Sequence, residues 1–208
     1  MPPKKKITEE ILIEAAMRIV REQGINSVTA RTAAKAADCS IQPVFACFGT
    51  MENFKERIFE AALNDFAGQL EELTDSADYF GKVCNAVLQL AAEEPEVYRM
   101  LFCEQVCLGR TAEALRDSFL KHRKYLDKMV TMYGLSEKSC VEIINKGLVY
   151  LCGISVIVSA NRSYISVQKG TADTKMLVAD LVIAAQRKRD NEKKRIVRKI
   201  SDENNQSD

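Results

Sequence analysis

The stretch from Thr29 to Phe48, TARTAAKAADCSIQPVFACF, predicts two short helices joined by a tight turn. Thr29 precedes an alanine-rich run, and its hydroxyl can satisfy a backbone N–H that a helix leaves unpaired at its start. Asp38 falls between the two helices, and aspartate tolerates the left-handed conformation that tight turns often need. Ser40 is expected to cap the second helix, and Pro43 falls in its first turn, where a missing N–H costs least. The pattern is that of a helix-turn-helix.

The second helix of such a motif lays its first residues against base edges in the major groove of DNA. Gln42 is the first candidate for base contact, because a glutamine amide can bond adenine N6 and N7 at once. The alternative for Gln42 is an ordinary exposed side chain. Ile41 and Pro43 are expected to meet thymine methyl groups, whereas Val44 is expected in the core.

A second group of residues is expected to contact the DNA backbone. Hydroxyls, guanidinium groups and helix N-terminal amides all bind phosphate, so Thr29, Arg31 and Ser40 are candidates. Phe45 completes the predicted DNA-facing set, although its ring is expected to pack more than to bind. The basic arm of residues 1–7, with its run of lysines, either follows DNA or serves only as a solubilising end.

Residues 8–60 resemble the DNA-binding domain of the tetracycline repressor (TetR) family of bacterial transcription regulators. The matching positions are Ile11, Leu12, Ala15, Ala16, Gly24, Thr29, Arg31, Ala34, Ala37, Ser40, Phe45, Phe48 and the run Thr50-Met51-Glu52-Asn53-Phe54. The chain departs from the family at Asp38, Phe45, Cys47 and Met51, where Gly, Tyr, an aromatic or His, and Lys are usual. The family's Tyr and Lys commonly contact phosphate, and neither contact carries over to Phe45 or Met51.

The resemblance implies an all-α fold with a three-helix head joined by a long helix to a helical body that binds a ligand and dimerises. The expected division is residues 1–50 for the DNA-binding domain, 51–200 for the effector-binding and dimerisation domain, and 201–208 for a tail. The resemblance further implies a homodimer on a pseudo-palindromic double-stranded operator. An effector in the body would change the angle of the long helix and so the spacing of the two heads.

Composition agrees with one cytoplasmic, helical protein and gives the two ends of the chain different charges. The chain has 208 residues, four Pro and nine Gly, which favours long helices. Residues 1–50 carry seven Lys and Arg against five Asp and Glu, whereas residues 70–120 carry four against ten. A mildly basic head on an acidic body suits a protein that presents one end to DNA. The N-terminus lacks a secretory signal, and the scattered, odd number of cysteines indicates a reducing compartment.

Apolar periodicity predicts helices throughout the remaining chain. The expected helices cover residues 8–23, 50–73, 78–93, 95–108, 111–133, 136–161 and 173–187, with a frayed extension to residue 199 and a disordered tail from residue 201. The segment 147–160 is apolar nearly all round, which predicts a helix buried on two sides. With the face around residues 176–185, it fits the dimer contact that the resemblance implies, through helices around 136–161 and 173–187. Its apolar run is too short to span a bilayer, so no membrane partner is expected.

The effector is expected to be a small, largely apolar molecule, neutral or cationic, held between the middle helices. Apolar and aromatic walls with a few polar tips make such a pocket. The candidate lining residues are Met100, Cys103, Phe119, His122, Tyr125 and Tyr150. Any one of them is as readily explained as ordinary core or surface.

No catalytic residue, cofactor or metal site is predicted. Cys103 and Cys107 share a helical face, but zinc needs further ligands and the chain has one His. Gly-rich phosphate loops and the common hydrolase motifs are missing from the sequence. The main interpretation is therefore a TetR-like repressor released from its operator by an effector. The alternatives are an effector-free DNA-binding module and, with less support, an all-α enzyme.

Overall fold

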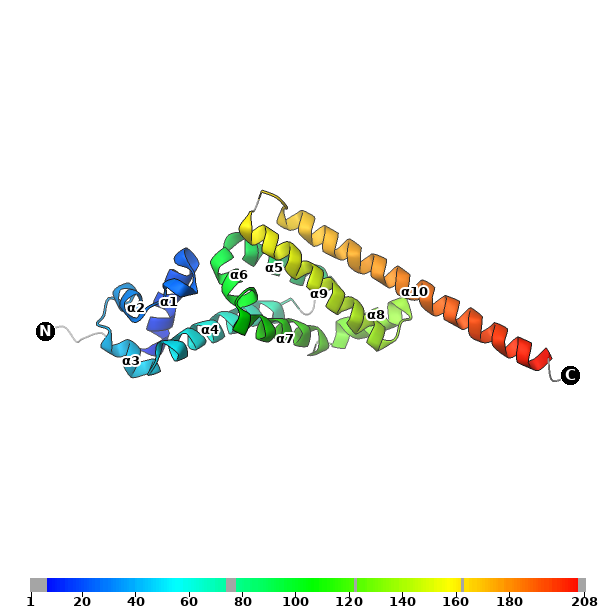
Figure 1. Cartoon of the computed structure of the whole chain (residues 1–208), viewed down its shortest axis with the longest axis horizontal. Helices are drawn as coiled ribbons and strands as arrows, with labels where there is room; N and C mark the ends of the chain where they lie inside the picture. Colours follow the sequence, from blue (N-terminus) through cyan, green and yellow to red (C-terminus); the bar gives the residue numbers. More distant parts are fainter. Residues whose placement is uncertain (1–6, 74–77, 122, 162, 206–208) are drawn as a thin grey trace.

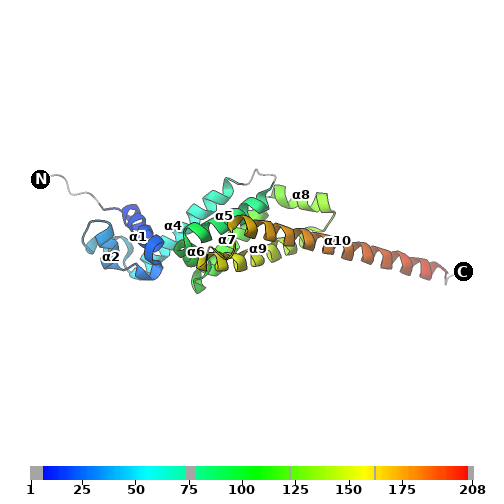
Figure 2. The ribbon, with the colours of Figure 1, turned by 90° about the horizontal axis from the view of Figure 1, so that it is seen from above.

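The computed structural model describes residues 7–73, 78–121, 123–161 and 163–205, and its regular structure there is entirely helical (Figure 1). The elements in chain order are α1 (Glu9–Gln23), the 3-10 turn η1 (Ile25–Ser27), α2 (Ala30–Ala36), α3 (Gln42–Phe48), α4 (Met51–Glu71), α5 (Tyr79–Glu93), α6 (Pro95–Phe102), α7 (Gln105–Lys121), α8 (Arg123–Tyr133), α9 (Glu137–Ala160) and α10 (Val167–Asn205). These described residues contain no strand, so the expected all-α class is confirmed. The molecule is elongated, with the α1–α3 head at one end and the last turns of α10 at the other (Figures 1 and 2).

The head is a small bundle of α1, α2 and α3. Leu12, Ala16 and Val20 of α1 are fully buried, which confirms the predicted apolar stripe. Gly24 ends α1 at φ 78°, and its N–H donates to the Val20 carbonyl at 2.9 Å. The small side chain of Ala33 is also fully buried, so α1 and α2 pack closely together. Local signals in the sequence therefore fix both the helices and their ends in the head.

The long helix α4 belongs to the head and to the body at once. Its 21 residues span about 30 Å. Near its start, Phe54 stacks on Phe48 of α3 with ring centroids 4.4 Å apart. Near its end, Phe66 meets Phe102 of α6 edge to face at 5.7 Å. The buried residues form one continuous core along this path, so the division at residues 50 and 51 stays a prediction.

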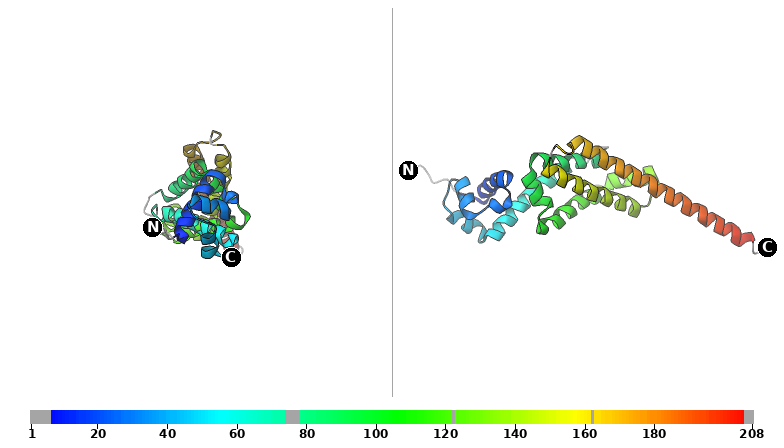
Figure 3. Two further views of the ribbon diagram at one scale, coloured as in Figure 1. Left: turned by 90° about the vertical axis from the view of Figure 1, so that its left-hand side faces the viewer. Right: turned by 45° about the horizontal axis from the view of Figure 1, so that its top comes forward.

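The body is built on α5, which packs against both α9 and α10 (Figure 3). Aromatic side chains from three helices meet beside α5. Phe119 of α7 lies 4.9 Å from Tyr79 and 5.8 Å from Phe80, and Tyr125 of α8 lies 5.9 Å from Tyr79. The Tyr79 hydroxyl donates to Ser118 at 3.0 Å. A packed aromatic cluster therefore occupies the middle of the body.

The body departs from the expected helices in two places. The expected helix 95–108 is wrong, because α6 ends at Phe102 and α7 begins at Gln105. The expected helix 111–133 is covered by α7 and α8 on either side of residue 122, which lies outside the described residues. The Thr111 hydroxyl donates to the Leu101 carbonyl at 2.7 Å, which satisfies an acceptor at the end of α6. The second departure is α10, a single helix of 39 residues that includes the expected frayed extension and most of the expected tail.

Candidate nucleic-acid interface

The first helix of the motif, α2, is fixed by a reciprocal cap. The Thr29 hydroxyl accepts from the Thr32 backbone N–H at 3.1 Å, and the Thr32 hydroxyl accepts from the Thr29 N–H at 2.9 Å. The Thr32 hydroxyl also donates to the Ser27 carbonyl at 2.9 Å, which ties the helix start to η1. The predicted cap at Thr29 is confirmed, and it holds α2 in a single orientation against α1.

The turn between α2 and α3 depends on one residue in the left-handed region. Asp38 has φ 53°, as its position in the sequence predicts. The Cys39 N–H donates to the Ala34 carbonyl at 2.9 Å and closes the end of α2. The expectation that Ser40 caps the second helix is wrong. Ile41 occupies the N-cap position with no side-chain cap, and α3 begins at Gln42 with Pro43 in its first turn.

The outer face of α3 is exposed and carries no charge. Val44 and Phe48 point inward and are buried, which confirms Val44 as a core residue. Gln42 is exposed, and Ile41 beside it is 40% exposed. The expectation that Phe45 packs is wrong, because its ring is 47% exposed. The reason is helical spacing. Val44 and Phe48 are four residues apart and share the buried side of α3, so Phe45 is turned outward.

Sequence reasoning missed two members of this face, Ala46 and Cys47. Both are exposed, and at the helical spacing of four residues Ala46 follows Gln42 and Cys47 follows Pro43. That spacing was available in the sequence. Ser40, Gln42 and Pro43 lie together at an open hollow of about 700 Å³ beside the start of α3, to which Ala46 and Cys47 also contribute. The side chains best able to contact bases are thus brought to one surface.

Two cations are exposed on α2, the helix that precedes this surface. Arg31 and Lys35 are exposed and lie one helical turn apart. Among the residues that the structure describes, neither has a carboxylate within 4 Å, so both are free to meet phosphate. Thr29 is exposed as well, although its hydroxyl is already engaged in the cap. The lysines of the basic arm lie outside the described residues.

The predicted effector residues do not converge on one cavity. Met100 and Phe119 are buried in the core, and Tyr125 packs in the aromatic cluster. Cys103 is exposed, and Tyr150 is 39% exposed on the outer side of α9. The opposite side of α9 packs on α5, so Tyr150 lies at the surface of the protomer, and its place at a ligand pocket stays a prediction. His122 lies outside the described residues.

Desolvation raises the pKa of three thiols of the body. It raises the pKa of the buried Cys84 to about 12, and it raises the pKa of the half-buried Cys152 and of the exposed Cys103 above the ordinary value. A raised pKa keeps a thiol protonated and weakly nucleophilic at neutral pH. Within the described part of the chain, no group of three His, Cys, Asp or Glu side chains is placed to hold a metal ion.

Solved structures share this fold, whereas sequence comparisons find nothing. No family model matches the chain, and no curated protein matches it in sequence. A transcriptional regulator from Pseudomonas aeruginosa PAO1 aligns with a TM-score of 0.68 and 13% identity, over 86% of this chain and 92% of that one. The fatty acid degradation regulator FadR from Bacillus halodurans aligns with a TM-score of 0.61 and 15% identity, over 86% of this chain and 97% of that one.

A third solved structure is a TetR variant from Acinetobacter baumannii AYE in complex with minocycline. It aligns with a TM-score of 0.54 and 16% identity, over 88% of this chain and 99% of that one. At such low identity the agreement concerns the fold. The chain thus has the TetR-like fold that the resemblance of residues 8–60 implies.

Proposed function

We propose that the protein is a homodimeric, TetR-like transcription regulator and acts as a repressor that leaves its operator when a small molecule binds the body. The observation that carries the proposal is the outer face of α3. It begins with an exposed glutamine at the N-terminal end of a short, capped helix-turn-helix, and the preceding helix, α2, carries two exposed cations. That combination is the one a recognition helix needs to read bases while neighbouring groups hold the backbone.

Each DNA-facing residue has a proposed role. Gln42 bonds the adenine edge, and Ile41 and Pro43 contact thymine methyl groups beside it. Arg31 binds phosphate as a cation, and Ser40 binds it as an exposed hydroxyl. Thr29 contributes through the N-terminus of α2, since its hydroxyl is used in the cap. Phe45 adds an exposed apolar contact beside the DNA backbone.

The dimer contact is proposed on the outer sides of α9 and α10. Val149 is 74% exposed and Met176 is 60% exposed, and Ile157 and Ile183 are nearly half exposed. These side chains recur at helical spacing along each helix. Gly153 lies among them, and a methyl group built there would meet open space, so a second helix can approach closely. An exposed apolar surface of this kind marks a protein contact.

A second copy explains this surface better than a membrane does. The expectation that the apolar run is too short to span a bilayer is wrong for the whole helix, because α9 is long and apolar enough to cross one. However, 44% of its most apolar window is buried inside the chain. Its inner side packs against α5, α6, α8 and α10. We assign its outer side to an isologous, two-fold contact and the protein to the cytoplasm.

The ligand-responsive part of the proposal rests on α4, which links the head to the body without a break. Two of the structures that share the fold are a regulator of fatty acid degradation and a TetR variant with bound minocycline. A ligand that shifts α4 would change the spacing of the two heads. Two heads fit one operator only at about one helical turn of DNA, roughly 34–36 Å.

An effector-free DNA-binding module is the second candidate, and one observation favours it. The middle of the body, where the sequence predicts a cavity, is filled by the aromatic cluster around Tyr79 and Phe119. A gel-shift titration of the full-length protein with its operator, repeated with added ligands, distinguishes the candidates. The repressor proposal predicts specific binding that a ligand weakens. Specific binding that no ligand affects would favour the second candidate, and equal binding to any duplex would contradict both.

A further inference from the structure

An apolar groove lies between α4 and α7, beside the filled centre of the body. Its volume is about 370 Å³, and small-molecule sites commonly measure about 300–1,000 Å³. Phe66 and Leu70 of α4 and Leu115 of α7 form a buried floor. Leu63 and Ala114 continue the apolar surface at half-buried positions. The groove has room for a molecule of a few rings.

The rim of this groove is negatively charged. Glu71 at the end of α4 lines it, together with Glu113 and Asp117 of α7. Asp117 has the Arg116 guanidinium at 3.8 Å. In residues 7–73, 78–121, 123–161 and 163–205, neither Glu71 nor Glu113 has a cation within 4 Å. Glu71 and Glu113 therefore border the apolar floor without a cation, and Asp117 has only a weak, half-exposed ion pair with Arg116.

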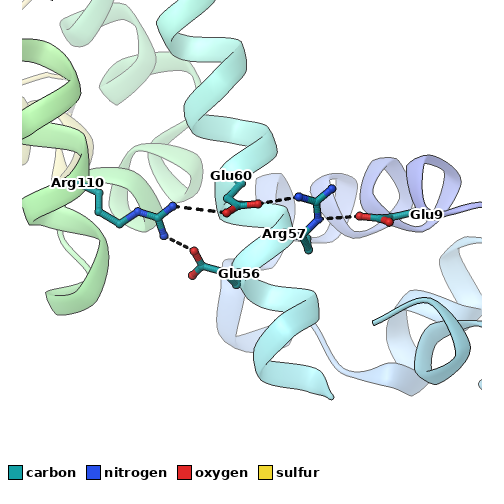
Figure 4. A network of polar contacts seen from close by, with 5 residues as sticks. All are labelled: Glu9, Glu56, Arg57, Glu60 and Arg110. Atoms are coloured by element: carbon teal, nitrogen blue, oxygen red, sulfur yellow. Dashed lines mark hydrogen bonds and ion pairs between the residues drawn. The ribbon is translucent and has the colours of Figure 1, made fainter. Parts of the chain in front are cut away.

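The cation that lines the groove, Arg110, is already held by α4. Its guanidinium is ion-paired with Glu56 and lies 3.7 Å from Glu60 (Figure 4). It also lies over the ring of Phe59, 4.6 Å from the ring centroid. Such a cation–π contact adds to the stabilisation that the ion pairs give to this position of Arg110. These contacts clamp the first part of α7 to α4 and leave the acidic end of the groove without an available cation.

The ion pairs of Arg110 with Glu56 and Glu60, here called the Arg110 clamp, are linked to further ion pairs that reach the head. Glu60 also accepts from Arg57 at 2.8 Å, and Arg57 donates to Glu9 of α1 at 2.7 Å (Figure 4). The five side chains therefore connect α7, α4 and α1 in one chain of ion pairs. Each exposed pair is weak by itself, but a network fixes the relative position of its members better than an isolated pair does.

We propose that the α4–α7 groove binds a lipophilic organic cation and that its occupation loosens the Arg110 clamp. The ligand site does not depend on the proposed function, and only the effect of the ligand on DNA binding rests on it. The apolar part of the ligand lies over Phe66, Leu70 and Leu115. Its positive charge lies between Glu71 and Asp117, about 16 Å along α4 from Glu60, so Arg110 does not repel it strongly.

The position of the ligand in the groove also explains how it changes the position of the head. Filling the groove separates the facing sides of α4 and α7. Arg110 then no longer reaches Glu56 and Glu60 at once, and the position of α4 relative to the body changes. The ligand shifts the protein only to the extent that it binds the open clamp better than the closed one.

The test compares two ions of matched shape and opposite charge. Tetraphenylphosphonium and tetraphenylborate are titrated calorimetrically into the full-length protein without DNA. We expect saturable binding of the cation and at least about tenfold weaker binding of the anion, a difference of about 1.4 kcal/mol. Equal binding of the two ions would contradict the charge assignment. Absence of saturable cation binding would overturn the site.

Two double variants locate the site. Glu71→Gln with Asp117→Asn removes two charges from the rim and should weaken cation binding about tenfold, as expected for two partly exposed charge contacts. Asp65→Asn with Glu72→Gln removes the same charge from α4 and its end, outside the groove, and should change binding less than about twofold. Equal weakening in both variants would mean that the cation binds elsewhere or only through overall charge.

A third variant separates binding from its consequence. In the wild type, saturating tetraphenylphosphonium should lower operator affinity about tenfold. Arg110→Ala should still bind the cation but show little of this response, because its clamp is already open. A full response in Arg110→Ala would contradict the role of the clamp. Since the calorimetric titrations contain no DNA, failure of the ligand site leaves the DNA-binding proposal intact.

Discussion

The molecule exposes apolar side chains on two surfaces that differ in size and setting. On α3 the exposed apolar side chains, Ile41 and Phe45, stand beside a glutamine, and the preceding helix, α2, carries two exposed cations. On α9 and α10 a longer apolar surface runs along two adjacent helices, as shown by Val149, Ile157 and Met176. The first surface is small and mixed with polar groups, and the second is broad and apolar.

These two settings fit different partners. A short apolar patch with an amide and nearby cations suits DNA, where thymine methyl groups lie among polar edges and phosphates. A broad apolar surface on two packed helices suits another protein surface of the same kind. Substitutions on the two surfaces should therefore have different effects. Those on α9 should change the oligomeric state, and those on α3 should cause smaller changes in DNA affinity.

The strongest response is expected on the α9 surface. Val149→Glu with Ile157→Glu would bury unpaired carboxylates in the dimer contact, which costs about 3–5 kcal/mol for each unpaired buried charge. The protein should then sediment as a folded monomer. Ile196→Glu on the projecting part of α10 is the matched control and should leave the dimer intact. A double variant that still sediments as a dimer would place the contact elsewhere.

A substitution on the inner side of α9 should affect the stability of the protomer and not the dimer contact. Ile154 is buried and packs against Gly170 of α10 within the same protomer. Ile154→Glu should therefore lower the melting temperature sharply instead of producing a stable monomer, because the charge is buried in the protomer core. Thermal melting with sedimentation distinguishes the two outcomes. A monomer with the melting temperature of the wild type would show that this residue belongs to the dimer contact.

On the α3 surface, Gln42→Ala should relax discrimination at one base step by about 1–3 kcal/mol. The measurement is binding to an operator and to its single-base variants. The fold should be unaffected, since Gln42 is exposed. Discrimination equal to that of the wild type at every step would remove Gln42 from the base contacts.

Arg31→Ala should weaken binding to all duplexes alike, because a phosphate contact carries no sequence information. The slope of log K against log salt should become shallower by about 0.9 for each phosphate that is no longer neutralised, or about 1.8 for two subunits. Arg187→Ala on α10 is a control of equal charge. An unchanged slope would exclude Arg31 from the phosphate contacts.

The weakest response is expected from Phe45→Tyr. The exposed ring stands where the resembled family usually has a tyrosine that contacts phosphate. An added hydroxyl should strengthen binding by about 0.5–1.5 kcal/mol, the usual net value of one hydrogen bond. The salt dependence should stay unchanged, since a neutral hydroxyl releases no counterion. Weaker binding would mean that Phe45 faces a base and not the backbone.

The head is predictable from the sequence because its signals are local. The cap at Thr29, the left-handed turn at Asp38 and the end of α1 at Gly24 each depend on a few neighbouring residues. The predicted cap at Ser40 is wrong, since α3 begins at Gln42, Ile41 precedes it, and no side chain caps the helix. The predicted packing of Phe45 is also wrong, and only the burial of Val44 and Phe48 shows that this ring faces outward.

The body is less predictable because its decisive contacts join residues far apart in the chain. The break after Phe102 contains no Gly or Pro, and it is stabilised by a hydrogen bond from Thr111 to Leu101. Arg110 and Glu56 are 54 residues apart, so their pairing has no signature in the sequence. The projecting part of α10 does not end where fraying is predicted, because its Lys, Arg and Glu residues are good helix formers and continue a helix that the body has already started.

A selection of binding sites from random duplex DNA with the full-length protein tests the proposed DNA-reading dimer most directly. Such a dimer should enrich an inverted repeat whose half-sites lie about 10–10.5 base pairs apart, or a multiple of that spacing. Repeating the selection with Gln42→Ala should retain the repeat and its spacing while one position in each half-site loses its preference. Enrichment of a single unrepeated site, or of no sequence at all, would contradict the proposal of a dimer that reads DNA through α3.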